Sequence, residues 1–161
     1  MWNAGVIDMA VQQLREFRLK PKVHQSIWAK VGLPAGEGPV LSDAINHGFS
    51  IDVVNRFAEA VSMPVTNLVQ YAGLSRATFA RRVKDKEHRL KPSESEAFAR
   101  MIRMYEAATL MLGGNKADAI QWLNEPAIGL NGKRPIELMG SESGTVDVIR
   151  LINRLMHGVY M

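Results

Sequence analysis

The chain has 161 residues, of which 47% are hydrophobic and 22% are charged, so it can build one ordinary domain or two small ones. It contains no cysteine, which excludes disulfides, thiolate metal sites and a cysteine nucleophile. No stretch approaches the roughly 18 consecutive apolar residues of a membrane helix, and no signal-peptide pattern opens the chain. We therefore expect a cytoplasmic protein without a membrane partner.

The net charge of +4 is concentrated in one segment. Residues 76–91 contain seven Lys or Arg residues and two acidic residues, so this stretch alone carries +5. A concentrated basic stripe is typical of a surface that binds a polyanion. A solvated helix face would show the same pattern, so charge alone leaves both interpretations open.

Apolar residues recur at helical spacing along the chain, and convincing two-residue alternation is absent, so the sequence predicts an all-α fold. The first apolar stripe predicts a helix that carries Val6, Met9, Ala10, Leu14 and Phe17. Residues 32–39 follow as a loop. We assign residues 1–49 to an N-terminal helical extension.

Two further helices are predicted before the basic segment. Ser50 can cap the first of them, whose apolar face consists of Ile51, Val54, Phe57, Ala58 and Val61. Pro64 suits the first turn of the second. That helix buries Val65, Leu68, Val69 and Ala72 and stops at Gly73.

The basic segment itself predicts a helix capped by Ser75, with Leu74 and Phe79 spaced for a hydrophobic staple. Two short helices joined by a glycine turn form a helix-turn-helix. On a helical wheel Phe79 and Val83 face the core, whereas Arg81 points away from it. The candidate DNA-binding residues are Ser75, Arg76, Ala77, Thr78, Arg81, Arg82, Lys84 and Lys86.

These residue types suit a helix that lies in the major groove of DNA. Small residues permit close approach, Arg81 can bind guanine with two hydrogen bonds, and shoulder cations such as Arg82 suit phosphates. One such module offers a small interface, so we expect a dimer that binds two half-sites of operator DNA. An ordinary surface helix is the alternative.

Downstream, Ser93 to Glu96 form a capping-box pattern that opens a long helix. Its apolar stripe consists of Phe98, Met101, Ile102, Tyr105, Ala108 and Leu112. Gly113 and Gly114 end this helix, and we place a domain boundary there. The predicted domains are therefore residues 50–112 and residues 113–161.

The last segment predicts shorter elements. Asn115 can cap a helix that contains Ile120, Trp122 and Leu123, and a glycine-rich turn then leads to Pro135. A final helix carries Val148, Ile149, Ile152, Leu155 and Met156 and ends at Gly158. So few residues can hardly bury this many apolar groups alone, so they pack on the long helix or await a partner.

No arrangement of residues indicates catalysis. The histidines are scattered, and neither HExxH, GxSxG nor a pair of carboxylates placed to share a proton occurs. Trp2, Trp28 and Trp122 lack the repeated spacing of a stacking platform and are predicted to anchor the core. We expect no enzymatic activity, no metal and no cofactor.

Two blocks of residues resemble a known family, the Xre/ParS/MbcA-type antitoxins. Upstream, residues 73–78 (GLSRAT) and the pair Arg81 and Arg82 resemble the family's Xre-type helix-turn-helix. The C-terminal block consists of Ala119, Trp122, Leu123, Pro126, Leu130, Gly132, Pro135, Leu138, Gly144, Val148, Leu151, Gly158, Val159 and Tyr160. Asn131 stands where many relatives have glycine, but Asn tolerates a left-handed backbone.

The resemblance implies a type II antitoxin, with an Xre/Cro-like helix-turn-helix domain followed by a small helical toxin-binding domain. Family members bind an NAD-degrading toxin of the RES-domain class, cover its active-site cleft with their C-terminal region, and repress the shared operon. The implied partners are therefore this toxin and operator double-stranded DNA, in a homodimer or a hetero-oligomer with the toxin. A free-standing helix-turn-helix regulator with a C-terminal dimerisation domain is the alternative. The candidate toxin-binding residues are Trp122, Leu123, Pro126, Leu151, Leu155, Met156, His157, Gly158, Val159, Tyr160 and Met161.

Overall fold

The structure, a computed structural model, describes residues 26–158, and these form helices with no strand among them. One isolated antiparallel bridge joins Ser50 and Arg89. The predicted all-α fold is thus confirmed for this part of the chain. The first predicted helix and Trp2 lie outside the described residues. None of the helices in residues 26–158 is long and apolar enough to cross a membrane.

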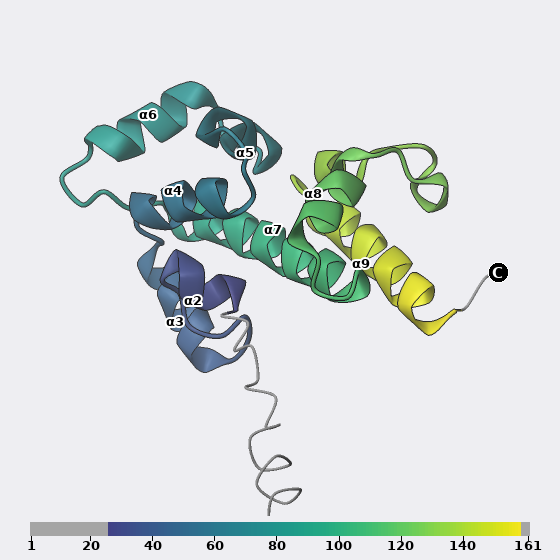
Figure 1. Cartoon of the computed structure of the whole chain (residues 1–161). Coiled ribbons are helices and arrows are strands. Elements are labelled where there is room, and N and C mark those ends of the chain that lie inside the picture. Colours follow the sequence, from purple (N-terminus) through teal and green to yellow (C-terminus); the bar gives the residue numbers. More distant parts are fainter. Residues whose placement is uncertain (1–25, 159–161) are drawn as a thin grey trace, which may run out of the picture.

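The described elements follow one another along the chain with short connections (Figure 1). They are α2 (Ile27–Val31), α3 (Pro39–His47), α4 (Ile51–Ala60), α5 (Val65–Tyr71), α6 (Arg76–Lys84), α7 (Pro92–Met111), α8 (Lys116–Asn124), the 3-10 turns η1 (Ile128–Leu130) and η2 (Pro135–Leu138), and α9 (Glu142–His157). The sequence predicted residues 1–49 as a helical extension, and α2 and α3 are the described helices within it.

The long helix α7 is the centre of the fold (Figure 1). It contacts α2 and α3 as well as α8 and α9. Its apolar stripe is buried as predicted, except that Leu112 is only half-buried. Because both sets of neighbours pack on the same helix, one hydrophobic cluster extends from α2 to α9.

The elements before α7 are fixed by burial and by one hydrogen bond from a buried tryptophan. The predicted apolar face of α4 is buried throughout, from Ile51 to Val61. Trp28 is 1% exposed, and its indole N–H donates to Glu106 Oε2 of α7 over 2.9 Å. The prediction that Trp28 anchors the core is confirmed, and this contact attaches α2 to the central helix.

The start of α7 differs from the sequence prediction. The N-cap is Lys91 rather than Ser93, and Pro92 takes the first helical position, where its missing N–H costs nothing. The Glu94 carboxylate accepts the Lys91 backbone N–H at 2.8 Å, which makes one half of a capping box. The fully buried Ser95 hydroxyl accepts the Phe49 N–H at 2.8 Å and donates to the Lys91 carbonyl at 2.9 Å.

Beyond α7 the predicted caps are confirmed. The Asn115 side chain accepts the backbone N–H groups of Ala117 and Asp118, and α9 ends at Gly158 in a left-handed conformation. Asn131 adopts a φ of 55°, so the turn does survive the replacement of glycine at this position. These local signals place the helix ends where the sequence predicts them.

The segment before α4 is hydrogen-bonded to the segment before α7 at a glycine. The Leu90 N–H donates to the Phe49 carbonyl at 2.8 Å, and Arg89 Nη1 donates to the Gly48 carbonyl at 2.8 Å. Gly48 has a φ of 88°, and a Cβ added there would collide with the carbonyl oxygen of Leu90. Both the backbone angle and the close approach therefore require glycine.

Replacing Gly48 by alanine should destabilise the fold by more than the strain of a left-handed backbone alone. Gly113→Ala is the matched control, because Gly113 also has a positive φ, 66°, but has open space where a Cβ would be added. We expect about 1–2 kcal/mol of destabilisation for the control, and at least about 1 kcal/mol more for Gly48→Ala. Urea unfolding of both variants measures the difference, and equal losses would contradict the proposed collision.

Candidate nucleic-acid interface and C-terminal interaction surface

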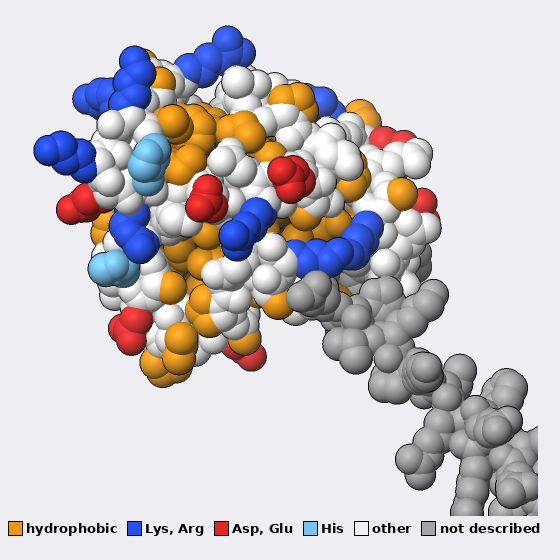
Figure 2. All heavy atoms as spheres, turned by 60° about the vertical axis from the view of Figure 1, so that its left-hand side comes forward, with side chains coloured by type: hydrophobic (Ala, Val, Ile, Leu, Met, Phe, Trp, Pro, Cys, Tyr) orange, Lys and Arg blue, Asp and Glu red, His pale blue; other side chains and the backbone are white. Residues whose placement is uncertain are grey.

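The helix α6 lies at the surface, and none of its residues is buried. Most of the candidate DNA-binding residues have exposed side chains, and Lys and Arg side chains gather at the upper left of Figure 2, over α6 and the loop that follows it. The exposed candidates are Ser75, Arg76, Ala77, Arg81, Lys84 and Lys86, while Thr78 is half-buried. The helix thus presents a basic, accessible face.

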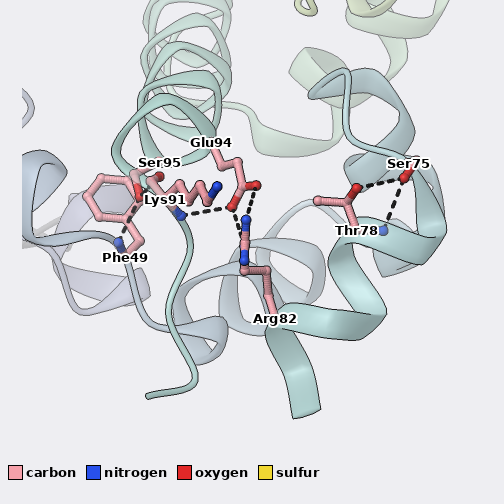
Figure 3. Close-up of polar contacts among 7 residues, drawn as sticks. All are labelled: Phe49, Ser75, Thr78, Arg82, Lys91, Glu94 and Ser95. Carbon is pink, nitrogen blue, oxygen red and sulfur yellow. Dashed lines mark hydrogen bonds and ion pairs between the residues drawn. The ribbon is translucent and has the colours of Figure 1, made fainter. Parts of the chain in front are cut away.

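The start of α6 is built as the sequence predicts. Ser75 Oγ accepts the Thr78 N–H at 3.0 Å, and its hydroxyl donates to Thr78 Oγ1 at 2.8 Å (Figure 3). The preceding turn closes with the Leu74 N–H on the Val69 carbonyl at 3.0 Å. Leu74 and Phe79 are both half-buried against the hydrophobic cluster, as a staple requires.

The second half of α6 corrects the helical-wheel prediction. Val83 is 38% exposed and does not face the core, although it lies one turn after Phe79. The reason is that α6 packs mainly on α5, and Phe79 is its one residue in the hydrophobic cluster. A wheel indicates which residues share a face, but it does not show how much of that face meets a neighbour.

Arg82 is also placed differently from the prediction, because it is engaged within the protein. Its Nε donates to Glu94 Oε2 at 3.0 Å, and its Nη2 donates to Glu94 Oε1 at 3.1 Å (Figure 3). The two side chains are 16% and 11% exposed, so this two-point ion pair is largely covered. Arg82 therefore connects α6 to the first turn of α7, and two of its donors are taken up by Glu94.

The Glu94 carboxylate is held in its charged form. Burial by itself raises the pKa of Glu94, but the hydrogen bonds from Arg82 and from the Lys91 N–H outweigh that effect, so the pKa lies below its ordinary value. A carboxyl pKa lowered by folding stabilises the fold above the ordinary carboxyl range. That contribution is lost as the pH falls through the lowered pKa.

At the other end of the molecule, the last part of α9 extends beyond the core. The helix packs through Val148, Leu151 and Ile152, but every residue from 153 to 158 is exposed. In Figure 1 this end projects past α7 and α8 toward the C-terminus. The exposed stretch includes two large apolar side chains, Leu155 and Met156.

The structure separates the candidate toxin-binding residues into two groups. Leu123 and Leu151 are 4% and 8% exposed, so nearly all of each side chain belongs to the core. Each of them stacks its helix on α7 or on the 3-10 turns, which is why the apolar pattern alone did not distinguish them from surface residues. Of the others, Trp122 is half-buried, and Pro126, Leu155, Met156, His157 and Gly158 are exposed. Val159, Tyr160 and Met161 lie outside the described residues.

One exposed apolar residue near this end escaped the sequence analysis. Ile128 is 96% exposed at the tip of the glycine-rich turn that precedes η2. An apolar residue within a turn of glycine and asparagine is the signal that could have identified it, since turns normally carry polar side chains. Within residues 26–158, no group of three or more His, Asp or Glu side chains could hold a metal ion.

Comparisons with known proteins cover both surfaces. Residues 40–103 match the model of the antitoxin Xre-like helix-turn-helix domain, and residues 107–158 match that of the antitoxin Xre/MbcA/ParS C-terminal toxin-binding domain. A protein named Antitoxin Xre from Yersinia enterocolitica is 38% identical over 136 residues, 84% of this chain and 91% of that protein. Another Antitoxin Xre, from Photorhabdus laumondii, is 30% identical over 147 residues, 91% of this chain and 99% of that protein.

The ion pair between Arg82 and Glu94 should determine how firmly α6 is held. Arg82→Ala should speed amide hydrogen exchange in α6 at least about fivefold and leave α7 unchanged, because α6 has little burial to hold it in place. Glu94→Gln keeps an oxygen that can accept the Lys91 N–H, so it isolates the loss of charge. Arg81→Ala is the control, since Arg81 is exposed and takes part in no ion pair among the described residues.

The double variant decides whether the two residues act together. If the pair is one unit, Arg82→Ala combined with Glu94→Gln should exchange no faster than Arg82→Ala alone. Additive effects of the two changes, or an equal effect of Arg81→Ala, would contradict the assignment.

Proposed function

Because this chain belongs to the Xre family of type II antitoxins, we propose that it neutralises an NAD-degrading toxin of the RES-domain class and represses their shared operon. The observation that carries the proposal is the match to a toxin-binding domain over residues 107–158, where α9 presents exposed apolar side chains. The proposal gives the chain two binding functions and no catalytic step.

We propose that residues 50–112 bind the operator and that residues 113–161 bind the toxin. The helix α6 is the part that enters the major groove, with Arg81 bound to a base and Lys84 and Lys86 on phosphates. Arg82 then acts by positioning α6, and not by direct contact with DNA. One α6 covers few base pairs, so the proposal includes a dimer or hetero-oligomer that spans two half-sites about 34–36 Å apart.

The loss of Arg81 and the loss of Lys84 should weaken DNA binding in different ways. Arg81→Ala should lose discrimination at one base pair by about 1–3 kcal/mol, because a bidentate contact to guanine disappears. Lys84→Ala should weaken binding to all sequences alike and reduce the slope of log affinity against log salt by about one. Competition binding with single-base operator variants at several salt concentrations separates the two, and identical behaviour would refute these roles.

For the toxin, we propose that the segment from 151 to 161 carries neutralisation, with Leu151 as the buried anchor of α9. An NAD-binding cleft accepts an aromatic base, a ribose and an anionic pyrophosphate. The ring of Tyr160 suits the first. The exposed end of α9 supports this proposal, because it carries Leu155 and Met156 away from the core toward the tail.

Ending the chain after Met156 should separate the two binding functions. The shortened protein should fold and bind operator DNA with unchanged affinity, because α2 to α8 are intact and α9 loses only its exposed last residue. It should fail to protect cells that express the toxin and fail to preserve their NAD. Leu110→Ala is the control, because it removes an apolar side chain that is 65% exposed on α7, outside the deleted segment.

Full protection by the shortened chain would show that the tail is not the blocking segment. Neutralisation would then have to come from the surface around Trp122 and Pro126.

A further inference from the structure

A groove of about 630 Å³ lies between the turn at residues 129–133 and the helix α9. Lys133 lines it from the turn, and Arg150 and Arg154 line it from α9. Asp147 is the one acidic residue in its lining. The groove is therefore cationic, although it is far along the chain from the basic segment that includes α6.

The three cations of the groove are available to a partner. All three side chains are exposed, and none takes part in an ion pair within residues 26–158. Arg134, the neighbour of Lys133, differs because it is paired with Glu137 at 2.8 Å. Arg150 and Arg154 also lie one helical turn apart, a spacing at which like charges repel. An anionic partner would relieve that repulsion.

The walls of the groove are fixed before any partner binds. The Gly132 N–H donates to the Ala127 carbonyl at 3.0 Å, and the Ala127 N–H donates to the Lys133 carbonyl at 3.1 Å. At Gly129 the turn lies so close to α9 that an added Cβ would stand 2.7 Å from Leu151 Cδ1. A rigid groove pays less ordering entropy when it binds, which favours a lasting interface.

Apolar side chains also belong to the groove and its edge. Leu130 and Leu138 line it, and Ile128, 96% exposed, directly precedes Gly129 on the wall that the turn forms. Exposed apolar residues next to charges are typical of a protein interface. A site for a nucleic-acid backbone relies instead on cations that neutralise phosphates.

We propose that this groove binds an acidic segment of the toxin, with Ile128 inserted into an apolar pocket beside it. The inference rests on the proposed function, because the groove lies inside the stretch that matches a toxin-binding domain. It adds a second contact to the tail and specifies the chemistry of the partner's face as carboxylates next to a hydrophobic depression.

The test uses the full-length chain and the purified toxin encoded by the adjacent reading frame. Lys133→Glu combined with Arg150→Glu should lower toxin affinity at least about tenfold, chiefly through slower association, and should weaken its salt dependence. Ile128→Ala should lower the affinity through faster dissociation. Neither change removes a buried group, so the thermal unfolding of each variant should match that of the wild type.

Lys30→Glu combined with Lys116→Glu is the matched double charge reversal, on α2 and α8 outside the groove, and should leave toxin affinity unchanged. If the groove variant binds toxin like the wild type while the chain ended after Met156 does not, the groove is not a docking site but the proposed function stands. If the wild type does not bind the toxin at all, the proposed function itself fails. A groove variant that loses operator affinity instead would assign the groove to nucleic acid and overturn the proposal.

Discussion

The burial of α7 is the constraint on which the rest of the structure depends. Phe98, Met101, Ile102, Met104 and Ala108 are completely buried, and Tyr105 is 2% exposed. These side chains lie on several faces of the helix, and α2, α3, α8 and α9 all pack on it. A helix that is apolar around most of its circumference is stable only inside a protein. Both halves of the chain are therefore assembled on one rod about 30 Å long.

The two ends of this rod are stabilised by different forces. At the C-terminal end, the packing of Val148, Leu151 and Ile152 holds α9. At the N-terminal end, consecutive polar contacts link Phe49 to Ser95, Ser95 to Lys91, Lys91 to Glu94 and Glu94 to Arg82 (Figure 3). The helix α6 depends on these contacts and on half-buried Phe79. The helix α6 is thus held by an ion pair and by limited packing, whereas the half that matches a toxin-binding domain is held by burial.

The sequence predicted the structural features that depend on neighbouring residues. Caps at Ser75 and Asn115, the stop at Gly158 and the apolar faces of α4 and α7 each depend on a few neighbouring residues. It did not predict the features that depend on contacts with residues distant in the chain. Val83 is exposed because no apolar element covers that part of α6, and Arg82 is occupied by a residue twelve positions away. Burial of Leu123 and Leu151 likewise follows from how α8 and α9 stack, which periodicity does not specify.

The sharing of α7 also shapes how such a protein can diverge. A substitution of a buried residue in α7 affects the elements that carry both surfaces. We therefore expect the buried residues of α7 to vary little among related proteins. Arg81 and Lys84 at one end, and Ile128 and Lys133 at the other, are exposed, and neither set contributes to the common core. Either surface can therefore acquire a new partner while the other keeps its own. Under the proposed function, a lineage of such proteins can follow changes in its toxin and keep the same operator sequence.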